Sequence, residues 1–223
     1  MSFTDALQQA FQSKRPARGW YITGTDTGIG KTTVACSLLH AAAELGLRTQ
    51  GMKPIASGCV NNQNDDALAL QQASSVKSAY QLVNPYALEA PIAPHLAAKR
   101  QGVVIDLAVI KDAYSELRKR SDCLIVEGAG GWLAPASENL HQSDLVAALE
   151  LDVVLVVGMR LGCINHALLT ARALAADGAR IVGWIANLMD PNMLELEGNL
   201  QTLKQRLNTP YLGAHKFVIR SVA

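Results

Sequence analysis

A glycine-rich turn between an apolar run and a helical pattern is the feature that most constrains the fold. The run at residues 20–23, WYIT, is short and apolar, and it leads directly into GTDTGIGKTT. Apolar residues then recur at helical spacing over residues 32–45. A strand, a tight turn and a helix in immediate succession predict a βα unit whose turn lies at the positive end of the helix.

The alternation of strand and helix continues along the chain. Short apolar runs rich in branched residues predict strands at 20–23, 50–54, 122–127, 153–158, 181–187 and 210–213. Helical spacing between them predicts helices at 32–45, 66–74, 105–120, 166–176 and 193–207. Runs that are apolar on both faces suit parallel strands covered by helices. The sequence therefore predicts an α/β fold with a doubly wound, mostly parallel sheet and helices on both faces.

Length and composition limit the organisation and the partners of the chain. Its 223 residues, 49% of them hydrophobic, suit one large domain. We expect residues 1–18 to be an N-terminal extension and residues 19–223 to form a single α/β domain. A net charge of +1 without a long basic run argues against nucleic acid as a partner. The sequence has no apolar segment long enough to predict a membrane span. Its four cysteines are isolated and its N-terminus shows no signal-peptide pattern, so we expect a cytoplasmic protein.

The turn itself resembles a phosphate-binding loop. The strict pattern G-x-x-x-x-G-K-[ST] needs a glycine at Thr25, but the glycine stands one residue earlier, at Gly24. The end of the motif, Gly30-Lys31-Thr32, fits fully. Backbone N–H groups in such a turn bind phosphate oxygens, the lysine contacts the β- and γ-phosphates, and the hydroxyl binds Mg²⁺. We predict a P-loop NTPase type of domain that binds ATP; the alternative is a glycine-rich turn without a ligand.

Two acidic positions could complete a magnesium site. Glu127 ends an apolar strand and precedes GAGG, which is the position of a Walker B-like carboxylate. Its alternative is an ordinary strand-end acid that faces water. In NDDALALQQA, Asp65 resembles a helix N-cap and Asp66 lies in the first turn, where helix capping alone could account for it.

A second lysine and two further segments point to a co-substrate. Lys53 follows a predicted strand and precedes Pro54, with Ser57 shortly after; a cation there could hold an anionic substrate near the γ-phosphate, although a surface lysine would look the same. Residues 128–144 form a long irregular segment, which is often functional. A helix that opens near Cys163–Asn165 offers a second positive helix end for a carboxylate, unless Asn165 is only an N-cap.

These pieces together resemble the dethiobiotin synthetase family. The matching stretches run in order from about residue 21 to 190 and cover most of the chain. They are TGTDTGIGKTTVA, MKPIASG, DALALQ, NPY, PIAPHLAA, VEGAGGW, VVGMRLGCINHALLTA and GWIAN. A threonine at the position of Thr25 is normal in this family. The resemblance implies an ATP-dependent ligase of biotin biosynthesis that converts 7,8-diaminopelargonic acid, CO₂ and ATP–Mg²⁺ into dethiobiotin, ADP and phosphate.

The resemblance also implies roles for individual residues. The Mg²⁺ ligands would be Thr32, Asp66 and Glu127. The nucleotide cradle would consist of Gly28, Ile29, Gly30, Lys31, Thr32 and Thr33, with Gly128 and Gly130 beside it and Asn187 on the adenine. Lys31, Lys53 and Thr27 would be catalytic. The carbamate and the diamine would be held by Thr27, Lys53 and Ser57, with Pro94 in the pocket wall. In this family a homodimer completes the pocket, and Cys163, Ile164 and Asn165 would receive the distal carboxylate there.

One segment departs from the family pattern. A GEIP-like segment usually follows the last strand and closes over the base, whereas this chain has GAHKF at residues 213–217, with Lys216 at the position of a proline. The departure predicts weaker discrimination between nucleotide bases than the family shows.

Two other classes of protein share the P-loop. ParA and MinD-like switch ATPases carry a second lysine early in the loop, where this chain has Asp26, and neither a basic surface nor an amphipathic membrane tail is evident. Glutamine-dependent cobyrinate amidases need a further domain with a nucleophilic cysteine, for which the chain is too short.

Overall fold

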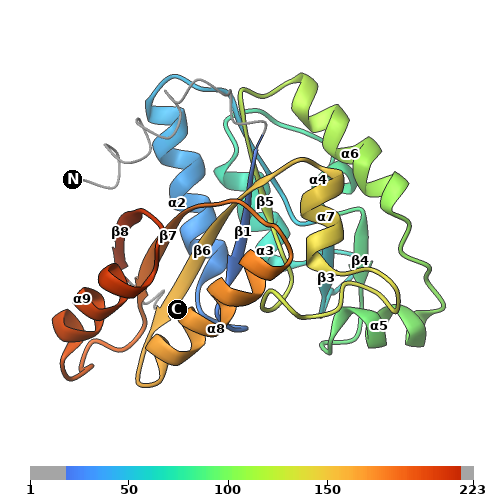
Figure 1. The fold of residues 1–223 in the computed structure, drawn as a ribbon. Coiled ribbons are helices and arrows are strands. Elements are labelled where there is room, and N and C mark those ends of the chain that lie inside the picture. Colours follow the sequence, from blue (N-terminus) through green and yellow to red (C-terminus); the bar gives the residue numbers. More distant parts are fainter. Residues whose placement is uncertain (1–18, 217–223) are drawn as a thin grey trace.

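A parallel sheet forms the centre of the molecule in the computed structural model, which describes residues 19–216 (Figure 1). Within these residues, six strands pair in the order β2-β5-β1-β6-β7-β8, and each neighbouring pair is parallel. The strands are β1 Trp20–Gly24, β2 Thr49–Met52, β5 Cys123–Glu127, β6 Asp152–Met159, β7 Ile181–Leu188 and β8 Tyr211–Lys216. The predicted extension at residues 1–18 lies outside the described part, so the predicted domain limits stay a prediction.

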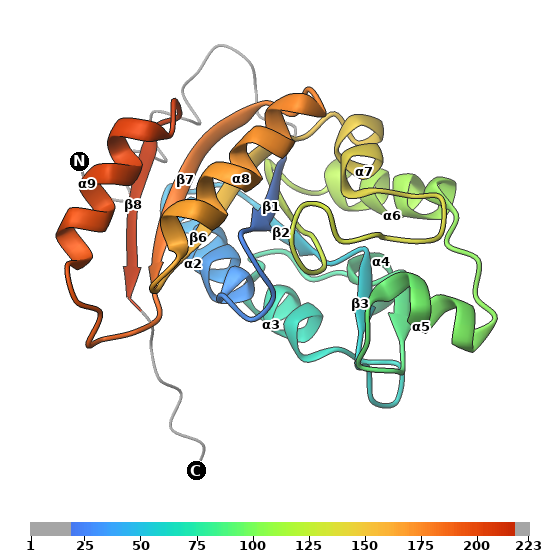
Figure 2. The ribbon, with the colours of Figure 1, turned by 60° about the horizontal axis from the view of Figure 1, so that its bottom comes forward.

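Helices cover both faces of the sheet, as Figures 1 and 2 show. Helices α2 and α3 pack on one face and α6, α7, α8 and α9 on the other. Their bounds are α2 Lys31–Glu44, α3 Asp65–Ala73, α6 Leu107–Lys119, α7 Gln142–Ala148, α8 Cys163–Ala176 and α9 Leu196–Arg206. The α/β, doubly wound, parallel architecture predicted from the sequence is confirmed.

Alternation along the strands explains why both faces are apolar. In β1, Trp20 and Ile22 pack toward α2, whereas Tyr21 packs toward α7 on the opposite face. In β6, Val154 and Val156 face α2, and Val153, Leu155 and Val157 face the other layer. Successive side chains of a strand point to opposite faces, so a sheet covered on both sides needs apolar residues at every position.

A smaller unit lies beside the main sheet and was not predicted. Strands β3 Ile55–Ser57 and β4 Tyr86–Leu88 form a parallel pair, with α4 Tyr80–Val83 and α5 Pro94–Gln101 near it. The strands have three residues each, too few to show a period of two. The predicted helix at 166–176 in fact begins at Cys163, and the strand predicted at 210–213 continues to Lys216.

Two further findings concern the class of the protein. The described helices are all too short or too polar to span a lipid bilayer. The cysteines of the described chain form no disulfide bond: Cys59, Cys123 and Cys163 are buried and Cys36 is partly buried, in agreement with the reduced cysteines that the sequence suggested.

Candidate functional site

The predicted phosphate-binding loop joins β1 to α2 and has the backbone that such a loop needs. Gly28 and Gly30 adopt φ values of 71° and 81°, a region that favours glycine. A Cβ on Gly28 would meet nothing within 4 Å, so its backbone borders open space. Thr33 is exposed in the first turn of α2, whereas Ile29 is buried and anchors the loop.

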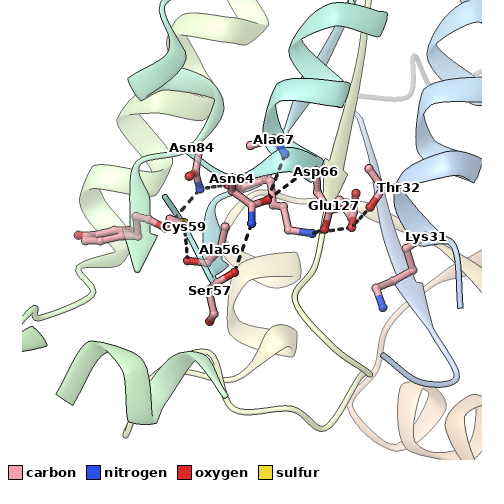
Figure 3. A network of polar contacts seen from close by, with 12 residues as sticks. Lys31, Thr32, Ala56, Ser57, Cys59, Asn64, Asp66, Ala67, Asn84 and Glu127 are labelled. Atoms are coloured by element: carbon pink, nitrogen blue, oxygen red, sulfur yellow. Dashed lines mark hydrogen bonds and ion pairs between the residues drawn. The ribbon is translucent and has the colours of Figure 1, made fainter. Parts of the chain in front are cut away.

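Lys31 is held within this loop. Its ammonium donates a hydrogen bond of 2.9 Å to the carbonyl oxygen of Asp26, and only 6% of the residue is exposed. In Figure 3 its side chain points away from Glu127. Burial, together with the nearby charge of Lys53, lowers the pKa of Lys31 against the opposing attraction of Glu127. A positive charge in this position suits phosphate oxygens.

Strand register brings Lys53 and Glu127 together. Met52 of β2 is the partner of Val126 of β5, so the next residues, Lys53 and Glu127, emerge side by side at the carboxyl ends of adjacent strands. Lys53 Nζ lies 2.7 Å from Glu127 Oε1 and 2.7 Å from Asp66 Oδ2. Ligands of open α/β sheets bind at this edge.

Thr32 completes the cluster of predicted magnesium ligands (Figure 3). Its hydroxyl donates a 2.9 Å hydrogen bond to Glu127 Oε1, while Glu127 Oε2 is buried with no hydrogen-bond partner among residues 19–216. An unpartnered carboxylate oxygen beside a hydroxyl and a second carboxylate fits a hard divalent cation. The described residues hold no cluster of three His, Cys, Asp or Glu side chains, so such an ion would complete its shell with phosphate and water.

Charge rather than burial controls the protonation of this cluster. Burial would lower the pKa of Lys53, but the charges of Glu127 and Asp66 outweigh it and raise the pKa. Burial would likewise raise the pKa of Asp66, but the ammonium of Lys53 outweighs it and lowers the pKa. The lysine and Asp66 are therefore both charged at neutral pH.

The N-cap of α3 differs from the prediction. Asn64, not Asp65, caps the helix: its Oδ1 accepts hydrogen bonds from the backbone N–H groups of Asp66 and Ala67, at 3.1 and 3.2 Å. Asp65 is the first helical residue and is exposed. Because Asn64 satisfies the helix end, the side chain of Asp66 is free to face Lys53 instead of capping.

Ser57 and Thr27 belong to different parts of the described chain, the β3–β4 pair and the P-loop. Ser57 ends β3, and its hydroxyl is buried without a hydrogen-bond partner in the described chain. Thr27 is exposed in the P-loop, and a Cβ built on Gly130 would lie 3.6 Å from its Oγ1. The P-loop thus lies close to the segment after β5, while the predicted roles of Thr27 and Gly130 stay predictions.

Gln142 holds the segment after Glu127, and the sequence gave no signal for it. The Tyr21 hydroxyl donates to Gln142 Oε1, and Gln142 Nε2 donates to the carbonyl oxygens of Ala129 and Ala134, at 3.1 and 3.0 Å. A Cβ on Gly128 would lie 2.4 Å from the Tyr21 hydroxyl, so glycine is needed there. An isolated glutamine in an irregular stretch carries no pattern that could have identified it.

The remaining predicted residues lie farther along the sheet edge. Pro94 is buried at the first position of α5, next to the β3–β4 pair. Cys163 opens α8, but its thiol faces Asn199 of α9, with 3.7 Å between Sγ and Oδ1. Ile164 is partly buried, and Asn165 is exposed. The N-cap of α8 is Gly162, so Asn165 is not the cap.

Asn187 lies at the carboxyl end of β7, against the P-loop. It is 1% exposed, and its Nδ2 donates to the carbonyl oxygen of Ile29 at 2.6 Å. Its predicted contact with adenine stays a prediction, while its observed contact is with the loop backbone. The segment at residues 213–217, which departs from the family pattern, extends past Lys216, where the described chain ends.

Solved structures share this fold at low sequence identity. A complex of the cell division proteins MinC and MinD from Aquifex aeolicus superposes with a TM-score of 0.54 at 18% identity, over 92% of this chain and 83% of the other. A ParA family ATPase from Chlorobium tepidum TLS gives 0.55 at 13% identity, over 91% and 86%. These similarities establish the P-loop fold of the chain and nothing more specific.

Sequence relatives are far closer. Residues 18–216 match a family model described as an AAA domain. The ATP-dependent dethiobiotin synthetase BioD of Xanthomonas axonopodis pv. citri (strain 306) is 56% identical over 198 residues, 87% of this chain and 88% of the relative. That of Xylella fastidiosa (strain 9a5c) is 53% identical over the same shares. With the P-loop, the Thr32–Glu127 pair and Lys53 all in place, the chain belongs to the family of ATP-dependent dethiobiotin synthetases.

Proposed function

We propose that this ligase makes dethiobiotin through a carbamate that is phosphorylated at the edge of the sheet. One amine of 7,8-diaminopelargonic acid attacks CO₂ and loses a proton, which gives the carbamate. A carbamate oxygen then attacks the γ-phosphorus of ATP and displaces ADP. The second amine attacks the resulting carbamic–phosphoric anhydride at carbon, loses a proton and closes the cyclic urea, with phosphate as the leaving group.

The observation that carries the proposal is the convergence of Lys53, Glu127 and Thr32 beside the P-loop. Lys53 Nζ contacts Glu127 Oε1 at 2.7 Å, and the same oxygen accepts from Thr32 at 2.9 Å. A buried ammonium next to the phosphate loop is suited to hold an anionic carbamate near the γ-phosphate. Positioning and neutralisation of charge supply most of the catalysis of such a phosphoryl transfer.

We assign the nucleotide to the P-loop. Lys31 would contact the transferring phosphate, and backbone N–H groups from Gly28 to Thr33 would bind the phosphate oxygens. Gly128 and Gly130 would border the same space, which the short distance from a Cβ built on Gly130 to Thr27 Oγ1 supports. Asn187 would support the loop and, as in the family, the adenine.

We assign magnesium to Thr32, Asp66 and Glu127. Bound there, it would neutralise charge that develops on the phosphate oxygens. The buried, unpartnered Oε2 of Glu127 supports this assignment. Since Lys53 occupies Glu127 Oε1 and Asp66 Oδ2, the lysine would exchange these partners for the carbamate when the ion and the substrate bind.

Substrate contacts beyond Lys53 are assigned to Thr27, Ser57 and the wall at Pro94. The buried hydroxyl of Ser57, without a partner in the described chain, could donate to the carbamate or accept from an amine. The start of α8 at Cys163–Asn165, where Asn165 is exposed, would receive the distal carboxylate across a two-fold homodimer. We also assign the enzyme to the cytoplasm, because cysteines without disulfide bonds stay reduced there.

Phosphate release tests this reaction directly. A dethiobiotin synthetase releases phosphate only when diaminopelargonate and bicarbonate are both present. Omission of either should reduce the rate to background. A MinD or ParA-like switch ATPase would hydrolyse ATP without them, so substrate-independent hydrolysis at the full rate would refute the proposed chemistry.

A further inference from the structure

His215 lies beside Asn187 at the carboxyl ends of β8 and β7. The two residues are direct partners in the parallel register, and Asn187 in turn pairs with Gly158 of β6. The last strand therefore delivers a histidine to the sheet edge that carries the P-loop. His215 was not among the residues predicted from the sequence.

A continuous line of polar contacts leads from His215 to the P-loop. His215 Nδ1 lies 3.2 Å from Asn187 Oδ1, and Asn187 Nδ2 donates to the Ile29 carbonyl oxygen at 2.6 Å. A Cβ on Gly30 would lie only 2.3 Å from Asn187 Nδ2, so the amide packs tightly on the loop. On its other side, His215 Nε2 lies 2.9 Å from the hydroxyl of Ser37 in α2.

The chemistry of the partners assigns the protons. Because Asn187 donates through Nδ2, its Oδ1 faces the histidine and can only accept, so His215 Nδ1 carries a hydrogen. Burial lowers the pKa of His215, which favours the neutral ring with this single N–H. Nε2 is then an acceptor, and the single hydrogen of the Ser37 hydroxyl, which donates to the Thr33 carbonyl oxygen at 3.0 Å, can turn toward Nε2 only by leaving Thr33.

We propose that His215 is a positioning residue of the nucleotide site: it fixes the orientation of the Asn187 amide, and the amide holds the backbone at Ile29 and Gly30 in its phosphate-binding form. Without the histidine donor, the amide can rotate by half a turn. Rotation would set its oxygen against the Ile29 carbonyl oxygen, two acceptors facing each other. The loop would then lose its lateral support, and its N–H groups would no longer be held toward the phosphates.

Kinetics of a His215→Ala variant test the proposal. We expect the KM for ATP to rise about tenfold, the effect of one buried hydrogen bond, with the KM for diaminopelargonate unchanged. His215→Asn can present an N–H near the place of Nδ1 and should restore most of the ATP affinity. Ser37→Ala, which removes only the far contact of the ring, is the matched control and should change the KM for ATP less than His215→Ala does.

A double-mutant cycle with Asn187 separates positioning from a structural role. If His215 acts through Asn187, the variant with both residues changed to Ala should bind ATP no more weakly than Asn187→Ala alone. The proposal is overturned if the two losses add, if His215→Asn performs no better than His215→Ala, or if both KM values rise together. Melting temperatures of the same variants show whether a change in KM merely follows a loss of folded protein.

Discussion

Lys53 Nζ lies 2.7 Å from Glu127 Oε1, and the two side chains are only 6% and 1% exposed. A carboxylate buried this deeply needs a cation, since an unpaired buried charge is strongly destabilising. Lys53 therefore neutralises Glu127 in this structure, and we propose that the same ammonium holds the carbamate during the reaction.

Lys53→Met removes both the counter-charge of Glu127 and the proposed contact with the carbamate. Removal of the ammonium leaves Glu127 buried without its cation, so we expect a loss of roughly 3–5 kcal/mol in the free energy of unfolding. Ring closure should be nearly abolished. Urea denaturation and product formation measure the two effects.

Magnesium provides the control for this variant. A divalent cation can replace the missing charge at Glu127 and Asp66, so Mg²⁺ should stabilise Lys53→Met more than the wild type. The double variant Lys53→Met/Glu127→Gln no longer buries a charge at position 127 and should recover part of the lost stability. Equal stabilisation of both proteins by Mg²⁺ would mean that these carboxylates do not bind the ion.

Glu127→Gln examines the metal site without a change of shape. The amide keeps an oxygen for the Thr32 hydroxyl but removes the negative charge that a divalent cation requires. We expect the concentration of Mg²⁺ needed for half-maximal activity to rise about tenfold or more, as for loss of a metal ligand or its immediate support. A titration of activity with Mg²⁺ at fixed ATP measures this, and an unchanged midpoint would remove Glu127 from the site.

The opposite shifts of Asp66 and Lys53 predict the pH range over which the cluster stabilises the fold. The pKa of Asp66 is lowered, so its contribution is present above the unfolded value of about 3.9 and is lost as the pH falls through the folded pKa. The pKa of Lys53 is raised, so its contribution is complete below the unfolded value of about 10.4 and is lost as the pH rises through the folded pKa.

The variant Asp66→Asn tests how much Asp66 contributes to the loss of folding stability at low pH. Between roughly pH 5 and pH 3, where carboxylates titrate, its free energy of unfolding should fall less than that of the wild type. Denaturation at a series of pH values makes the comparison. Parallel curves for the two proteins would show that Asp66 contributes nothing to the acid sensitivity.

Gln142 offers a prediction about the loop that follows Glu127. Gln142→Leu removes the donors to Ala129 and Ala134, so the turnover number should fall while the dissociation constant of ATP stays close to that of the wild type. Tyr21→Phe removes only the hydroxyl that orients Gln142 and should have the same effect to a smaller degree. Equilibrium binding of a fluorescent ATP analogue and steady-state rates test this; a loss of ATP affinity equal to the loss in turnover would contradict it.

The sequence predicted the glycine-rich turn and the alternation of strands and helices, because local patterns encode them. Gly30-Lys31-Thr32 marks the start of α2 within one residue. The contact of Lys53 with Glu127 was beyond such patterns, since it depends on which strands become neighbours and on their register. The same holds for His215 and Asn187, which meet across β7 and β8.

Capping shows a different limit of the sequence. In NQNDDALAL, three neighbouring residues can each accept from free N–H groups, so residue type cannot decide among them. Asn64 is the cap because its backbone is extended, with φ −118° and ψ 133°, whereas the helix has already begun at Asp65. The Asn64 backbone N–H also donates to Tyr80 at 2.8 Å, a distant contact that helps to fix this choice.

The two positive-φ glycines of the P-loop form a matched pair for a final prediction. Gly28→Ala introduces a methyl group into open space, so its effect comes from the left-handed backbone alone, about 1–2 kcal/mol. Gly30→Ala meets the same backbone penalty and also drives its Cβ into Asn187 Nδ2, 2.3 Å away. We expect Gly30→Ala to be clearly less stable than Gly28→Ala. Addition of Asn187→Ala removes the clash and should recover stability in the Gly30→Ala background but not in the Gly28→Ala background. Urea denaturation of the four variants makes the comparison, and equal destabilisation by the two glycine substitutions would show that Asn187 does not pack on the loop.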